Sequence, residues 1–144
     1  MEALEIRTSQ QSEMREITRE VQAVVTRRNL RAGLVLVYVP HTTAGVTINE
    51  NADPTVAADL LAALERLVPW RQPGYQHSEG NSAAHIKATL TGSSVCVPVE
   101  HGRLTLGQWQ GVFLCEFDGP RTRRVFVRVT AEQERQGLAA ERGR

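Results

Sequence analysis

Four strand-like segments follow one another in the last third of the chain, separated only by short turns. The segments are SVCVPVE, RLTL, QWQGVFLCEF and RRVFVRVT, and the turns between them are HG, G and DGPR. All four are rich in β-branched, aliphatic or aromatic residues, which favour strands. Turns this short join neighbouring strands only when the strands run antiparallel. The sequence therefore predicts an antiparallel sheet.

The first two-thirds of the chain predict helices mixed with further strands. Apolar residues from Met14 to Val25 recur at helical spacing, and Asp53-Pro54 is typical of a helix start because Asp caps free amides and Pro suits the first turn. The full expectation is a strand over 4–8, a helix over about 14–28, a buried strand over 34–39, a short strand near 46–48, helices over 54–68 and 82–90, and a loop over 70–80. Because no regular βαβ repeat occurs, this pattern predicts an α+β fold with antiparallel sheet and two to three helices. We expect one domain over 1–144, with a polar tail from about residue 132.

Charge and hydropathy exclude two classes of partner. The formal net charge is +1, which gives no electrostatic footprint for nucleic acid. No apolar run approaches the roughly 20 residues that a membrane-spanning helix needs, and no charged-then-apolar leader opens the chain. We therefore expect a soluble, cytoplasmic protein that binds neither nucleic acid nor membrane.

The two cysteines give no indication of a metal or redox motif. Cys96 and Cys115 each lie inside an apolar run, and neither has a CxxC or CxxH neighbour. We expect both to be free, buried and unreactive.

Polar side chains are concentrated where the predicted strand 34–39 ends. The stretch PHTTAGVTINENADP places His41, Thr42 and Thr43 directly after that strand, and Glu50 and Asp53 a few residues later. Such residues also satisfy the backbone of an ordinary turn, so this stretch alone leaves both readings open.

Histidines in two further segments favour a pocket. His77 and His85 are embedded, like His41, in small or polar residues, in HSEGN and AAHIK, whereas His101 lies in a turn where we expect it to be exposed. Three imidazoles with an open position suit a divalent metal such as zinc, and without a metal they suit a general base. Their spacing matches no compact metal signature.

Charged residues supply a second group of candidates. Glu50 has no evident structural task, whereas Asp53 is explained as a helix cap. Glu116 lies on an alternating strand among aliphatic neighbours, and we expect it to reach solvent unless it lines a cavity. Lys87, the only lysine in the chain, and Arg121 are candidates for binding phosphate, because Lys and Arg side chains recognise it. No nucleotide-binding glycine motif is present, so a standard nucleotide-binding fold is not indicated.

The combined motifs resemble the YjbQ family, whose members are described as secondary thiamine-phosphate synthases. The resemblance is carried by HTTAGVTINENADP, HSEGNSAAHIKATLTG, PVEHGRLTLGQWQGVFLCEFDGPR and RRVFVRV, in order, from about residue 4 to residue 130. It implies an α+β fold with a β-sandwich-like pair of sheets, a homotrimer, and a weak thiamine-phosphate synthase activity. That reaction joins a hydroxymethylpyrimidine diphosphate to a thiazole phosphate and releases pyrophosphate.

The resemblance also implies roles for particular residues. It assigns catalysis to His41, His85, Glu50 and Lys87, binding of a phosphorylated substrate to Thr42, Thr43, Asn81, Gln110 and Arg121, and a possible divalent metal, zinc or magnesium, to His41, His77 and His85. Two other functions stay open: a metal-dependent hydrolase of a phosphorylated metabolite, and a non-catalytic trimer that binds a metal or an anion.

Overall fold

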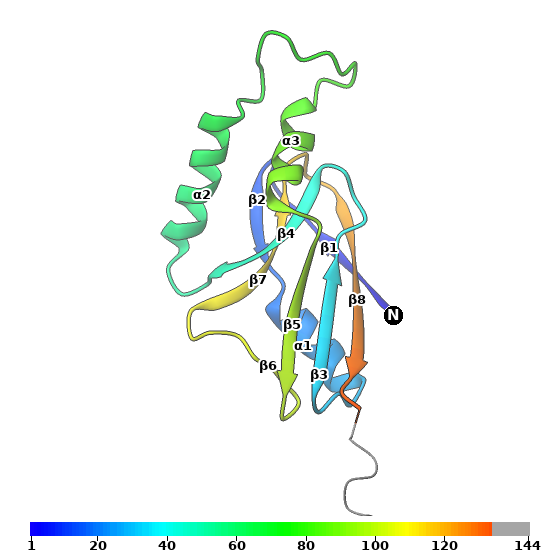
Figure 1. The fold of residues 1–144 in the computed structure, drawn as a ribbon. Coiled ribbons are helices and arrows are strands. Elements are labelled where there is room, and N and C mark those ends of the chain that lie inside the picture. The colour runs from blue at the N-terminus through cyan, green and yellow to red at the C-terminus, as the bar shows by residue number, and fades with distance from the viewer. Residues whose placement is uncertain (134–144) are drawn as a thin grey trace, which may run out of the picture.

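Two antiparallel sheets make up most of the protein. The computed structural model describes residues 1–133 (Figure 1). A five-stranded sheet has the order β1-β8-β3-β5-β6, and a three-stranded sheet has the order β2-β7-β4, with every neighbouring pair antiparallel. The strands are β1 Glu2–Arg7, β2 Glu13–Glu16, β3 Gly33–Tyr38, β4 Ala44–Glu50, β5 Ser94–Glu100, β6 Arg103–Leu104, β7 Gln110–Glu116 and β8 Thr122–Ala131. The antiparallel sheet predicted from the short turns is confirmed.

Three helices complete the fold: α1 Thr18–Arg27, α2 Pro54–Leu67 and α3 Ser82–Thr91. The predicted start of α2 is confirmed. The Asp53 carboxylate caps the helix by accepting hydrogen bonds from both the amide and the hydroxyl of Thr55. The short helix α3 also lies where its pattern placed it and ends at Gly92, whose φ of 97° breaks the helix.

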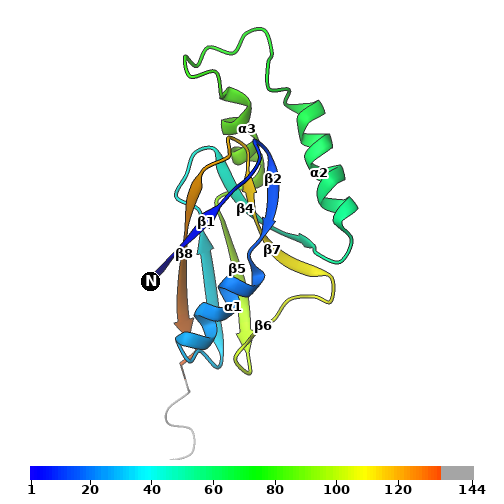
Figure 2. The ribbon, with the colours of Figure 1, turned by 180° about the vertical axis from the view of Figure 1, so that it is seen from behind.

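The main core lies between the two sheets and α1. The inner face of the five-stranded sheet is covered by the three-stranded sheet over one part and by α1 over the other (Figure 2). Valines dominate this core, including Val35 and Val37 of β3 and Val125 and Val127 of β8. The opposite face of the three-stranded sheet carries Cys115, which packs with Phe117 just after β7 in a second cluster formed with α2 and α3. The small sheet is therefore buried on both faces.

The outer face of the five-stranded sheet has no covering layer within residues 1–133. Leu34, Leu36 and Tyr38 of β3 point outward and are 48%, 42% and 43% exposed. Their cross-strand neighbours include Pro98 and Cys96 on β5. This apolar outer face, centred on β3, is unusual for a protein surface, where large contiguous apolar patches mark contact sites.

Several sequence expectations were wrong or inaccurate in detail. The strand that was expected to be buried over 34–39 is buried on one face only, because nothing within residues 1–133 covers its outer face. Residues Glu13–Glu16 form strand β2, and α1 begins only at Thr18, because the open edge of β7 pairs with this segment before the helix starts. The predicted strand RLTL pairs only over Arg103–Leu104. The expected short strand near 46–48 extends over all of β4. Cys96 is exposed on the outer face, although it is free as expected.

Several other expectations are met. Cys115 is free and buried, and burial raises the pKa of its thiol to about 12, so it is inert at neutral pH. Segment 70–80 has no helix or strand, as predicted. Within residues 1–133, no helix is long and apolar enough to cross a membrane. Most of the polar tail predicted from residue 132 lies outside the described residues.

Candidate ligand pocket

Two of the predicted histidines line one open cavity at the end of β3. The cavity has a volume of about 370 Å³. Its wall is formed by the loop after β3, the later turns of α3 and the residues that lead into β5; we call it the histidine pocket, and its lining is His41, Thr42, Ala44, His85, Ala88, Thr89, Gly92 and Ser93. Because His41 and His85 come from separate segments, the fold has to bring them together, as the sequence analysis expected.

The walls of the histidine pocket are joined by direct backbone contact. The amide of Val46 on β4 donates a hydrogen bond to the carbonyl of Gly92 at the end of α3, over 3.1 Å. Gly45 lies so close that a Cβ atom there would be 2.5 Å from the Gly92 oxygen. Only glycine allows this approach, so Gly45 is required for β4 and α3 to enclose the pocket.

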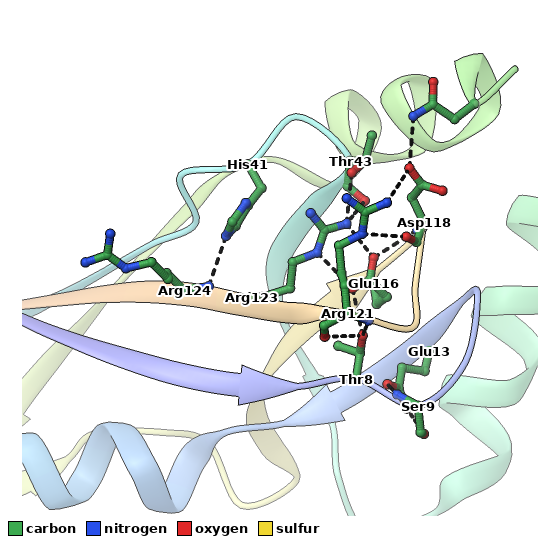
Figure 3. Close-up of polar contacts among 11 residues, drawn as sticks. Thr8, Ser9, Glu13, His41, Thr43, Glu116, Asp118, Arg121, Arg123 and Arg124 are labelled. Atoms are coloured by element: carbon green, nitrogen blue, oxygen red, sulfur yellow. Dashed lines mark hydrogen bonds and ion pairs between the residues drawn. The ribbon is translucent and has the colours of Figure 1, made fainter. Parts of the chain in front are cut away.

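A buried ion pair fixes the loop that carries His41 (Figure 3). The Arg123 guanidinium donates to both carboxylate oxygens of Glu116 and to the hydroxyl and carbonyl oxygens of Thr43. Arg123 and Glu116 are 2% and 0% exposed, so neither charge is solvated by water. The expectation that Glu116 reaches solvent was therefore wrong: it is buried because Arg123 neutralises it.

Further hydrogen bonds hold Glu116 in its charged form. Burial by itself would raise the pKa of Glu116, but hydrogen bonds from Arg123, from the Asp118 amide and from the Thr8 hydroxyl outweigh it, so the pKa lies below its usual value. The parts that Arg123 and Thr8 play around Glu116 were missed in the sequence. A signal existed for Arg123, because it alternates with the core residues Val125 and Val127 and so occupies an inward position of β8.

His41 is held by the backbone of the next strand. Its Nε2 atom accepts a hydrogen bond from the Arg124 amide over 3.0 Å (Figure 3). Burial, and then the positive charge of Arg123, lower the pKa of His41. The imidazole is therefore neutral at physiological pH.

The third histidine lies on the far side of His85. The rings of His77 and His85 meet edge to face, with centroids 5.3 Å apart. Together they line a second cavity of about 480 Å³ on the side of Tyr75. Among residues 1–133, no group of three His, Cys, Asp or Glu side chains is placed to share one metal ion. The chain therefore does not bring the predicted metal ligands to one point, and we derive no step through a metal.

The predicted phosphate-binding residues Asn81 and Arg121 meet at a carboxylate instead of in the pocket. Asp118 Oδ2 accepts hydrogen bonds from Asn81 Nδ2, over 2.9 Å, and from Arg121 Nη2, over 3.1 Å. Thr43 is likewise buried and occupied by Arg123. These three residues are not part of the lining of the histidine pocket.

Lys87 and the pair Glu50 and Gln110 lie elsewhere. The Lys87 ammonium is buried and bonded to Glu65 of α2. Glu50 and Gln110 are register partners at one end of the β4–β7 ladder, whereas Ala44, which lines the pocket, pairs with Glu116 at the other end. Six residues of strand separate the two ends, or roughly 20 Å. The structure thus does not place Glu50, Gln110 or Lys87 with His41 and His85 in the pocket of one chain.

Comparison with known proteins shows where this fold and pocket belong. The family model described as UPF0047 protein YjbQ-like matches residues 2–132. The UPF0047 protein YugU of Bacillus subtilis is 49% identical over 129 residues, which cover 90% of this chain and 98% of that protein.

Solved structures of related proteins have the same fold. An uncharacterised YjbQ/UPF0047-family protein of Clostridium acetobutylicum superposes with a TM-score of 0.88 at 46% identity, covering 90% of this chain and all of that one. A conserved hypothetical protein of Thermus thermophilus gives a TM-score of 0.85 at 49% identity, again with 90% and 100% coverage. The chain is thus an α+β protein of antiparallel sheets, as these relatives are. It belongs to the YjbQ/UPF0047 family, and the resemblance read from the sequence motifs is confirmed.

Proposed function

We propose that the protein is a thiamine-phosphate synthase-like transferase acting on small phosphorylated substrates in the histidine pocket. The reaction would join a hydroxymethylpyrimidine diphosphate to a thiazole phosphate. The observation that supports this most is the convergence of His41 and His85 with three hydroxyl-bearing residues, Thr42, Thr89 and Ser93, around one open cavity. A cytoplasmic location, expected from the sequence, suits such substrates.

The chemistry asks little of the protein beyond positioning and hydrogen bonding. The thiazole nitrogen attacks the methylene carbon of the pyrimidine, a C–N bond forms, and the C–O bond to the diphosphate breaks. Pyrophosphate leaves with the bonding electrons, so no oxidant or covalent nucleophile is required. Negative charge grows on the leaving oxygen, and donors already oriented toward it lower the barrier. His85 and the hydroxyls of Thr42 and Ser93 could supply such donors, whereas the Thr89 hydroxyl already donates to the His85 carbonyl.

Replacing His85 with alanine tests this proposal. We expect kcat/KM for thiamine phosphate formation to fall about 100-fold, because one oriented donor or acid is lost from the pocket. Thiamine phosphate would be measured fluorimetrically after oxidation to the thiochrome, with and without added magnesium or zinc. The matched control is His101→Asn, since His101 is exposed in a turn with φ of 52°, which asparagine tolerates.

Other outcomes assign a different function. If wild-type protein forms no thiamine phosphate above the enzyme-free rate, the transferase proposal is wrong. Release of phosphate from phosphomonoesters or diphosphates, lost in His85→Ala, would then identify a hydrolase. Ligand binding without any turnover would identify a non-catalytic binding protein.

We also propose that the protein is a homotrimer, as the family resemblance implied, and that the apolar outer face forms the contact. Replacing Leu34 with glutamate puts a charge on this face opposite the uncharged Pro98 and Thr130 and should give monomers, because a buried unpaired carboxylate is costly. Light scattering after gel filtration should give three times the 16.0 kDa chain mass for wild type and the single mass for the variant. Leu67→Glu is the control, because Leu67 is 74% exposed on α2, away from this face. A wild-type monomer, or a variant that stays trimeric, would contradict the assignment.

A further inference from the structure

The hydrogen bond between Arg124 and His41 determines which ring nitrogen carries the proton. A backbone N–H donates only to an unprotonated nitrogen, so Nε2 of His41 has no hydrogen. A neutral imidazole carries its single proton on the other nitrogen, and His41 is therefore the Nδ1–H tautomer.

The position of this bond in the sheet explains why it forms. In the β3–β8 ladder the last pair is Tyr38 with Phe126, and β3 has ended by the position opposite Arg124. The Arg124 amide on that side of β8 is left without a strand partner. The His41 ring takes the place of the missing carbonyl and accepts the hydrogen bond from the Arg124 amide. A backbone donor at a strand end needs such a partner.

This tautomer limits what His41 can do in the pocket. Nδ1 carries a hydrogen and has no lone pair to offer, so His41 can neither ligate a metal through Nδ1 nor accept a proton there. Ligation through Nε2 would require the Arg124 amide to lose its partner. The remaining capability of the ring is donation of one hydrogen bond from Nδ1.

The surroundings of His41 suit an acceptor oxygen and not a cation as the partner of that bond. The positive neighbours are the Arg121 and Arg123 side chains, and each is paired with a carboxylate, Arg123 with Glu116 and Arg121 with Asp118. With both carboxylates engaged, the nearby charges do not add up to a cation site. The rest of the pocket supplies hydroxyl-bearing residues, which bind phosphate oxygens readily.

We propose that the histidine pocket is a metal-independent oxyanion site, in which neutral His41 donates its Nδ1 hydrogen to an oxygen of a phosphate or pyrophosphate group. This inference deepens the proposed function by naming the chemistry of the ligand, but it holds for any phosphorylated compound. It replaces the metal role first expected for His41 with that of a donor.

The first test reads the tautomer directly in the full-length wild-type protein. Long-range ¹H–¹⁵N correlation spectra of histidine-labelled protein distinguish protonated from unprotonated ring nitrogens. We expect His41 to show an unprotonated Nε2 and a protonated Nδ1, and the Nδ1 resonance to move when inorganic pyrophosphate is added in the presence of EDTA. A protonated Nε2, or an Nδ1 signal unaffected by saturating pyrophosphate, would overturn the proposal.

The second test measures binding of pyrophosphate by calorimetry in EDTA. His41→Ala should bind it about 10- to 100-fold more weakly, the loss expected for one hydrogen bond to a charged group. His41→Asn should retain more of the affinity, since its amide NH₂ can stand in for Nδ1–H, and His101→Asn should match wild type. If EDTA abolishes wild-type binding and zinc restores it, the site depends on a metal and the inference fails.

The two proposals fail in different ways. Pyrophosphate binding in EDTA without any synthesis of thiamine phosphate would refute the transferase and leave the oxyanion site standing. Synthesis that strictly requires zinc bound by His41 would refute the oxyanion site and leave the transferase standing.

Discussion

Replacing Glu116 with alanine should lower the free energy of unfolding by about 3–5 kcal/mol, because the change leaves the Arg123 guanidinium buried without a counter-charge. Its contacts with Thr43 remain, but these are neutral and cannot compensate for the charge. The loop that carries His41 should loosen at the same time, since Thr43 is held by the same guanidinium. Urea unfolding followed by circular dichroism gives the free energy.

Two variants separate the buried charge from an ordinary loss of contacts. Arg15→Ala removes an exposed arginine on β2 and should change stability by less than about 0.5 kcal/mol. The double variant Glu116→Leu/Arg123→Met removes both charges and should be clearly more stable than Glu116→Ala alone. If the single and double variants are equally unstable, the unpaired charge is not the cause.

The Glu116–Arg123 pair also makes the free energy of unfolding depend on pH. The pKa of Glu116 is lower in the folded protein than its ordinary value of 4.5. Its contribution to stability is therefore complete above about pH 4.5 and is lost as the pH falls through the folded pKa. Glu116→Gln should show a flatter loss of stability over this acid range than wild type does, when unfolding is measured at successive pH values.

Replacing Glu65 with alanine should lower the free energy of unfolding by about 1–3 kcal/mol. Lys87 is 2% exposed, and its ammonium donates to Glu65, which joins α3 to α2. Without Glu65 the buried ammonium loses this carboxylate. The penalty is smaller than for Glu116 because the Glu65 side chain is 54% exposed, so water enters when it is removed.

The partner variant of this pair should behave differently. Lys87→Met keeps most of the side-chain volume and leaves Glu65 free to be solvated, so it should be close to wild type in thermal unfolding. Arg66→Ala, one residue along α2 and exposed, is the control for helix effects. A Lys87→Met variant as unstable as Glu65→Ala would show that the contribution comes from the Lys87–Glu65 pair itself and not from the cost of leaving the buried ammonium unpaired.

The elements were predictable where local chemistry alone determines them. Asp53-Pro54 starts α2 because the cap and the proline act within one turn, and Gly92 ends α3 for a similarly local reason. Strand β2 was not predictable, because its four residues become a strand only by pairing with β7, about a hundred positions away. The apolar residues from Met14 to Val25 do recur at helical spacing, but they belong first to strand β2 and then to helix α1.

The histidines of the pocket could be predicted from the sequence, but the residues that hold them in place could not. His41 follows an apolar run that reads as a strand and ends at a proline, which places it at a sheet end without further information. The distant position of Glu50 could not be read in this way, because the direction in which β4 leaves the turn depends on its register with β7. The burial of Glu116 depended equally on a partner, Arg123, across the next turn.

The close contact of Gly45 with Gly92 holds β4 and the end of α3 directly against each other. No side chain lies between them to act as a spacer or a hinge, and the carbonyl of Gly92 is already bonded to Val46. Moving these two walls of the pocket apart would therefore break this backbone contact. The lining side chains can be changed without breaking it, so engineering of the pocket's selectivity should begin with Thr42, Thr89 and Ser93.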